Sequence, residues 1–208
     1  MNMILTTFML LSCLNALAVS ETNKNQLLKL KSFAEIQGQF IQTKTLSELN
    51  VTIQTEGQFK INKGTDKKVI FYWNILKPSP SKICIDSEGI QISSNRPGGK
   101  REPKKIKFSE TGPETTTQML SFFKLLSLDE KSAQDFFFFR AEGKSFLLTP
   151  KNSTTSLFKT VHIEINHQGL IKNLQIDEKS TDKIEIHFFK LKTKNILTKS
   201  AADQFKCE

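Results

Sequence analysis

The regular alternation of apolar and polar residues is the feature that most constrains the fold of this chain. It is clearest in three segments near the C-terminus, whose apolar residues are Val161, Ile163 and Ile165, then Leu174 and Ile176, then Ile184, Ile186 and Phe188. Successive side chains of a strand point to opposite faces of a sheet, so this pattern predicts an antiparallel sheet with one buried and one solvated face.

The same pattern predicts strands earlier in the chain. We expect strands at 36–44, 51–62 and 69–75, a hairpin of 83–85 with 90–92, and a hairpin of 136–139 with 145–149. Pro78 and Pro80 end the third strand, and the basic stretch 94–105 is expected to be a flexible, exposed loop. Helical spacing predicts helices from Asn23 to about Ala34 and over 115–126. The chain is therefore expected to be mainly β (α+β), with one strongly curved antiparallel sheet that two helical segments cover.

Phenylalanine is strongly over-represented: 17 of the 208 residues are Phe, against one Trp and one Tyr. Phe has no polar atom, so this ring surface has to be buried or bound to something apolar. Either a ligand cavity or an ordinary filled core would satisfy the pattern, and periodicity does not separate the two. The run Phe136–Phe139 similarly fits a lipid contact or a strand buried on both faces. The residues that would line a cavity are Phe40, Phe59, Ile61, Phe71, Trp73, Ile83, Ile85, Ile90 and Ile92 on strands, with Met119, Phe122, Phe123 and Leu126 on the internal helix.

The N-terminal segment is interpreted as an export signal. Residues 1–20 carry no Asp, Glu, Lys or Arg, residues 4–14 are mostly apolar, and Ala16-Leu17-Ala18 fits signal peptidase, so cleavage after Ala18 would leave 19–208 as a single domain. A second interpretation is a loose lipobox at Leu10-Leu11-Ser12-Cys13, which would lipidate Cys13 and anchor the protein to a membrane. Export excludes nucleic acid as the reason for the net charge of +9. The charge then reflects a solvated lysine-rich surface or contact with anionic lipid head groups.

The sequence carries no recognisable catalytic motif. It lacks the nucleophile elbow Gly-x-Ser-x-Gly, a phosphate loop and a dinucleotide fingerprint, so we expect neither an enzyme nor a cofactor. One metal candidate joins His162 and Glu164 to Glu185 and His187, should their strands be neighbours, but a cross-strand polar ladder is the favoured interpretation and no metal site is expected. A disulfide between Cys84 and Cys207 is chemically reasonable after export. Nothing in the sequence brings the C-terminus to Cys84, so the pairing stays open.

Several short motifs, taken in order, resemble a known family. They are Gln39-Phe40-Ile41-Gln42, Gly57-x-Phe59, Phe71-Tyr72-Trp73 and Pro78, followed by Leu148-x-Pro150, Gly169-Leu170-Ile171 and His187-Phe188. This order is similar to that of the LolA/LolB-like periplasmic carriers of outer-membrane lipoproteins. The resemblance implies an incomplete β-barrel of about 10–11 strands, with helices covering its concave face and an apolar cavity for acyl chains. It also implies a soluble carrier that takes acylated lipoproteins from an inner-membrane ABC-type complex and passes them to an outer-membrane acceptor.

The chain departs from the family pattern at a position that is tied to chaperone function in the family. The best-studied members have an Arg just before the Trp-bearing strand, whereas the segment 63–68 reads Lys-Gly-Thr-Asp-Lys-Lys. Lysine does not reproduce the guanidinium fork, so the mode of handover is open. Alternative functions are a LolB-like acceptor anchored through Cys13, a carrier of another amphiphile such as a glycolipid, which the basic segment 96–107 would suit, and a lipid hydrolase, for which no nucleophile–base pair is visible. We expect a monomer.

Overall fold

The computed structural model describes residues 33–63, 69–96, 99–100, 103–110, 137–153, 156–195 and Cys207. The predicted signal segment, Cys13 and the internal helix 115–126 lie outside these residues. The predicted helix 23–34 also lies outside them except for its last two residues.

The described residues form twelve strands and one short 3-10 turn, η1 (Phe108–Glu110). The strands are β1 (Glu35–Leu46), β2 (Val51–Lys63), β3 (Val69–Lys77), β4 (Ser81–Ile85), β5 (Gly89–Arg96), β6 (Gly99–Lys100), β7 (Lys104–Lys107), β8 (Phe137–Glu142), β9 (Ser145–Pro150), β10 (Phe158–Ile165), β11 (Ile171–Glu178) and β12 (Lys183–Lys194). No helix formed by these residues is long and apolar enough to cross a membrane.

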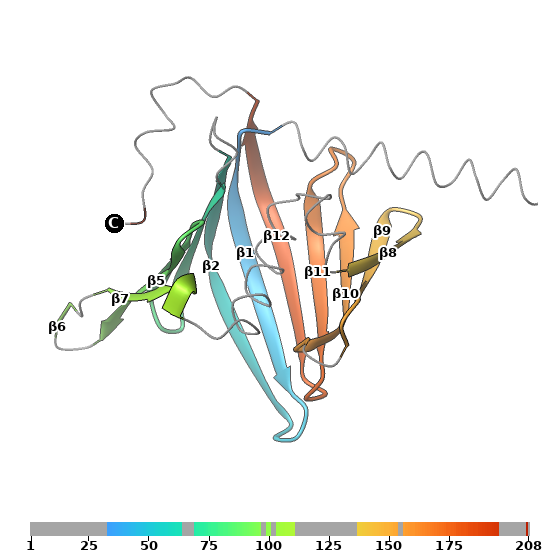
Figure 1. The fold of residues 1–208 in the computed structure, drawn as a ribbon, viewed down its shortest axis with the longest axis horizontal. Coiled ribbons are helices and arrows are strands. Elements are labelled where there is room, and N and C mark those ends of the chain that lie inside the picture. Colours follow the sequence, from blue (N-terminus) through green and yellow to red (C-terminus); the bar gives the residue numbers. More distant parts are fainter. Residues whose placement is uncertain are drawn as a thin grey trace, which may run out of the picture.

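All of these strands belong to one antiparallel sheet in the order β6-β5-β4-β3-β2-β1-β12-β11-β10-β9-β8, with β7 beside β5. The central pair is β1 with β12, so the N-terminal and C-terminal halves of the chain meet in the middle of the sheet (Figure 1). The sheet is curved and does not close, since β8 and the β5–β7 group form its two edges. The predicted class, an incomplete and strongly curved antiparallel barrel, is confirmed. The helical cover lies outside the described residues.

The predicted flexible loop 94–105 is partly wrong. Strand β5 continues to Arg96, and β6 and β7 both pair with it. The reason is visible in the register, which sets Ile106 of β7 opposite Ile90 of β5. A single apolar residue among lysines was too weak a signal to predict a strand, but it is enough to align one at the sheet edge.

A β-bulge interrupts the central pair of strands. Gln37 pairs with Lys192 and Gln39 with Phe189, so Lys190 and Leu191 of β12 both face Gly38. Lys190 adopts a φ of 51°, which lies in the left-handed region and fits the local distortion at a bulge. The bulge changes the alternation of β12, so that Leu191 packs against the same apolar cluster as Phe188.

Candidate apolar binding face

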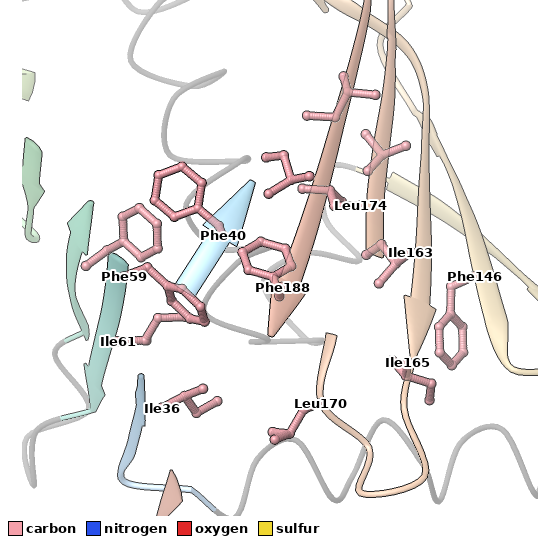
Figure 2. Packing of buried hydrophobic residues seen from close by; sticks show 14 of the residues in the cluster. Ile36, Phe40, Phe59, Ile61, Phe146, Ile163, Ile165, Leu170, Leu174 and Phe188 are labelled. Atoms are coloured by element: carbon pink, nitrogen blue, oxygen red, sulfur yellow. The ribbon is translucent and has the colours of Figure 1, made fainter. Parts of the chain in front are cut away.

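One face of the sheet carries a continuous cluster of buried hydrophobic side chains contributed by both halves of the chain. Figure 2 shows Phe59 and Ile61 of β2 on one side of it and Ile163 of β10 on the other. We call this inner surface the apolar face. Its buried members are Ile36, Phe40, Phe59, Ile61, Phe71, Trp73, Phe137, Phe146, Leu148, Val161, Ile163, Ile165, Leu170, Leu174, Ile176, Ile186 and Phe188.

Five aromatic rings of the apolar face form one cluster. Phe40 stacks on Trp73 with ring centroids 3.7 Å apart, and Phe71 stacks on the same indole at 5.5 Å. Phe188 meets Phe59 edge-on at 5.1 Å and Trp73 at 6.2 Å. The rings come from β1, β2, β3 and β12, so this aromatic cluster joins both halves of the chain across the central strand pair.

Two glycines make room for these rings. Gly57 lies opposite Phe40 in the β1–β2 register, and a Cβ on it would come within 2.6 Å of the Phe40 ring and 2.3 Å of the Asn74 carbonyl oxygen. At Gly38 a Cβ would lie 2.8 Å from Leu191 and 3.0 Å from Phe59. The glycines thus let large side chains of neighbouring strands lie flat across the backbone.

The structure brings the predicted strand residues of the cavity to this one face. Phe40, Phe59, Ile61, Phe71 and Trp73 are buried members of the cluster. The β3–β4–β5 register sets Trp73, Ile83 and Ile92 in one row and Phe71, Ile85 and Ile90 in the next. Ile83 and Ile85 pack against the cluster, Ile90 is buried and Ile92 is half-buried. The four helical residues of the prediction, Met119, Phe122, Phe123 and Leu126, lie outside the described residues.

Twelve of the seventeen buried members of the apolar face were missing from the predicted site. Ile36, Phe146, Leu148, Leu170 and Phe188 are examples that belong to the cluster but were not among the predicted cavity residues. The period-two alternation of the C-terminal strands was the signal that marked seven of the twelve as inward-facing, Phe188 among them. What it could not show is that β12 pairs with β1, which places those strands on the same curved surface.

The phenylalanine run is not a strand buried on both faces. Phe137 is 4% exposed and Phe139 packs against the cluster, but Phe138 is 62% exposed. Lys151 Nζ lies over the Phe138 ring, 5.5 Å from its centroid. Ordinary alternation therefore continues through the run, and one ring is left at the surface.

The pocket that described side chains line on the apolar face is small. A pocket of about 20 Å³ lies between Phe59, Phe71 and Phe188, with aliphatic residues around them. That is roughly room for one water molecule, whereas ligand pockets are typically about 300–1,000 Å³. Two roomier grooves, of about 420 and 360 Å³, lie on the outer face and are lined mainly by polar side chains. Hydrocarbon in either groove would leave those polar groups without partners.

The outer face carries the predicted polar ladder. The candidate metal site required β10 and β12 to be neighbouring strands. Strand β11 lies between them, so this requirement is not met. Glu164, Asn173 and His187 form a row in which Asn173 Nδ2 donates to Glu164 and its Oδ1 lies 2.6 Å from His187 Nδ1. The hydrogen bond from Asn173, together with that from Lys172, lowers the pKa of Glu164. Among the described residues, no group of three His, Cys, Asp or Glu side chains is arranged to hold a metal ion.

A disulfide joins the C-terminal end of the chain to the sheet. Cys84 of β4 and Cys207 are bonded, with their Cα atoms 5.7 Å apart and a sequence separation of 123. Cys84 lies opposite Tyr72 and Gln91, on the face away from Ile83 and Ile85. The bond therefore fixes residue 207 to the outer face.

Comparison with known proteins identifies one family. The family model for the outer membrane lipoprotein carrier protein LolA matches residues 31–208. A comparison with curated proteins gave no match.

Solved structures resemble the chain at low sequence identity. The Pseudomonas aeruginosa MucA/MucB complex contains a chain that is 12% identical with a TM-score of 0.49, and the alignment covers 86% of this chain and 58% of that one. A putative outer membrane lipoprotein-sorting protein domain from Vibrio parahaemolyticus is 9% identical, with a TM-score of 0.48 and coverages of 88% and 95%. Mycobacterium tuberculosis lipoprotein LppX is 10% identical, with a TM-score of 0.44 and coverages of 84% and 94%. The chain spans 58–62% of the length of the MucB chains it matches.

Proposed function

The chain belongs to the LolA family of outer membrane lipoprotein carriers, and from that premise we propose that it is a periplasmic chaperone for acylated lipoproteins. It would hold their acyl chains against the apolar face while they pass from the inner to the outer membrane. The implied partners are the lipoproteins, an inner-membrane ABC-type releasing complex and an outer-membrane acceptor. The work is binding and release, with no bond made or broken, so neither catalysis nor a cofactor is required.

The observation that carries this proposal is the extent of the apolar face. Its seventeen buried hydrophobic residues come from both halves of the sheet. Transfer of two acyl chains of about sixteen carbons from a bilayer to water costs roughly 25 kcal/mol of free energy, at about 0.8 kcal/mol per CH2. A carrier has to replace the bilayer with a surface that has no unpaired polar groups, which the outer face of this sheet does not offer.

The tight packing around Phe59, Phe71 and Phe188 implies that acyl chains enter by displacing side chains. The 20 Å³ pocket between them represents the empty, closed state in this proposal. A ligand would shift the population toward an open arrangement in which its chains replace contacts that the rings make with one another. The predicted cavity residues of segment 115–126, Met119, Phe122, Phe123 and Leu126, belong to this proposal as further contacts for the acyl chains.

A charge placed on the apolar face tests the proposal. Phe71→Glu should abolish lipoprotein loading, because an ionised carboxylate beside hydrocarbon has no partner. Ile83→Gln, at a half-buried position, is a milder variant that should fold and load weakly. Gln58→Glu, on the exposed outer side of β2, adds the same charge and should load normally.

Loading is measured by purifying the protein from its native envelope and identifying bound lipoprotein or lipid by native mass spectrometry. Bound diacylglyceryl-modified protein supports the lipoprotein carrier. A bound glycolipid would show that the apolar face binds a different cargo from the one proposed. Undiminished cargo on both Phe71→Glu and Ile83→Gln would reject the apolar face as the binding surface. The N-terminal mass of the same sample distinguishes cleavage after Ala18 from lipidation of Cys13, which would make the protein an anchored acceptor.

A further inference from the structure

The large hydrophobic side chains that the described residues leave exposed are concentrated at one end of the sheet. Their exposures range from 44% to 69%, whereas the apolar face is almost fully buried. We call this group the apolar rim. It consists of Leu49, Val51, Ile53, Leu76, Phe138 and Leu157.

The topology explains why residues so far apart in sequence share one end. Neighbouring strands are antiparallel, so the β1–β2, β3–β4, β9–β10 and β11–β12 connections and the start of β8 all lie at the same end of the sheet. Contacts join these connections to one another. Ser47 Oγ donates to the Thr181 carbonyl oxygen at 2.6 Å, and Lys179 N donates to the Leu157 carbonyl oxygen at 3.0 Å.

The opposite end of the sheet has a different character. Its described turns are polar, with Asp86-Ser87-Glu88 between β4 and β5, Gly143-Lys144 between β8 and β9, and Asn166-His167-Gln168 between β10 and β11. The hydrophobic residue that follows the last of these turns, Leu170, is 2% exposed. Exposed apolar surface at one end only is not what a uniformly solvated surface predicts, and it indicates a contact surface.

Two rim residues lie on the same side of β2 as the apolar face. Val51 and Ile53 have the same parity as Phe59 and Ile61, and the register places Val51 opposite Leu46. Thr55 and Gln42, which oppose each other in the register, separate them from the buried cluster. The inner side of the β1–β2 hairpin therefore carries apolar residues at its exposed tip, which projects beyond the rest of the sheet in Figure 1.

The charge around the rim favours an anionic surface. The described segments that form this end, 44–56, 76–82, 149–153, 156–159 and 178–183, contain seven lysines and four carboxylates. Lys151 lies over the exposed Phe138 ring. Lys77, which follows Leu76 in sequence, is 74% exposed and forms an ion pair with Glu56 at 3.5 Å. Apolar side chains flanked by lysines suit the interface of a bilayer, where the side chains enter the acyl region and the ammonium groups meet phosphate.

We infer that the apolar rim docks the protein on the surface of a bilayer that contains anionic phospholipid. Docking would place the hairpin tip, and with it the end of the apolar face, where acyl chains leave or enter the membrane. The role in cargo transfer rests on the proposed function, whereas membrane contact itself can be measured without cargo.

The test is co-sedimentation of the purified protein with vesicles of phosphatidylglycerol and phosphatidylethanolamine. The rim variant Leu49→Ser/Phe138→Ser/Leu157→Ser should partition at least about tenfold more weakly than the unchanged protein, because three exposed apolar side chains are lost. The charge variant Lys77→Glu/Lys151→Glu should also bind weakly. Its matched control, Lys144→Glu/Lys192→Glu, makes the same charge change at exposed positions of the opposite end and should bind normally. Thermal unfolding followed by circular dichroism verifies that each variant is folded.

Two results would overturn the inference. One is an unchanged protein that does not sediment with these vesicles, and the other is a folded rim variant that binds as well as the unchanged protein. Binding of a fatty acid, measured in the absence of vesicles, tests the proposed carrier function independently of membrane docking. A rim variant that binds the fatty acid but not the vesicles would support both the docking role of the rim and the carrier function. Binding of vesicles but no fatty acid by the unchanged protein would support the docking role and contradict the carrier function.

Discussion

At the scale of single residues, the apolar face depends on where side chains are absent as much as on where they are large. Phe40 crosses β2 at Gly57 and reaches Trp73 on β3, so a ring from one strand packs on the second strand along. The aromatic residues themselves were predictable from alternation. The flat stacking across Gly57 was not, because it depends on the register of three strands and not on any local pattern.

Adding a side chain at Gly57 should therefore destabilise the protein. Gly57→Val places its methyl groups where the Phe40 ring and the Asn74 carbonyl oxygen lie, and overpacking of this kind costs about 1–3 kcal/mol of unfolding free energy. Urea unfolding measures the cost. Gly143→Asn is the control, since that residue has a φ of 62° and no neighbouring atom within 4 Å, and Asn tolerates this conformation. Equal stability of the two variants would contradict the packing described for Phe40.

At the scale of elements, alternation was enough to predict most strands but not how the two halves join. Strands appear where they were expected at 36–44 and 51–62, and in the three C-terminal segments around 161–165, 174–176 and 184–188. Period two is a local property, so it can be recognised in each segment by itself. The pairing of β1 with β12 and the disulfide between Cys84 and Cys207 connect residues more than a hundred positions apart. Local sequence carries no record of such contacts. The strand β7 escaped prediction for a different reason, because its four residues include one apolar side chain.

An ion-pair cluster holds the start of β1 to both of its neighbours. Glu35 is buried, and its carboxylate lies 3.0 Å from Lys60 Nζ of β2 and 3.2 Å from Lys194 Nζ of β12. Burial alone raises the pKa of Glu35, but hydrogen bonds and charge attraction from the two lysines outweigh it and hold the pKa below its usual 4.5. The carboxylate therefore stabilises the folded state above the unfolded pKa, and this contribution disappears as the pH falls through the lower, folded value.

Glu35→Gln should remove this pH-dependent contribution. We expect the variant to lose about 1 kcal/mol of unfolding free energy at pH 7 and to show a shallower loss of stability than the unchanged protein below about pH 4.5. Urea unfolding at a series of pH values between 3 and 7 gives both quantities. Parallel curves for the two proteins would show that the lysines do not stabilise the Glu35 carboxylate.

The disulfide makes a separate prediction about the same half of the sheet. Closing a loop across 123 residues restricts the unfolded chain, and the expected gain is about 2–5 kcal/mol. Reduction with dithiothreitol should lower the urea midpoint of the unchanged protein toward that of Cys84→Ser. The same reagent should leave Cys84→Ser itself unaffected. A midpoint that does not respond to reduction would argue against a stabilising bond between these residues.

At the scale of the whole molecule, the two faces of the sheet are chemically opposite. The inner face is a hydrophobic surface shared by both halves of the chain, and the outer face carries lysines, glutamines and the hydrogen-bonded row from Glu164 to His187. Sequence alone predicted this division but could not say whether the inner side chains fill their own space or give way to a ligand. That difference depends on the relative stability of a closed and an open state, which no residue pattern encodes.

Trp73, the single tryptophan of the chain, stacks on Phe40 within the apolar face and can therefore report whether hydrocarbon reaches that face. A long-chain fatty acid brominated at mid-chain quenches tryptophan fluorescence on contact. If acyl chains bind at the apolar face, this probe should quench Trp73 saturably, and Phe71→Glu should abolish the quenching. Brominated butanoate should not quench, because it is too short to gain from burial. Absence of quenching while the fatty acid is bound elsewhere on the protein, or no binding of the fatty acid at all, would contradict acyl-chain binding at the apolar face.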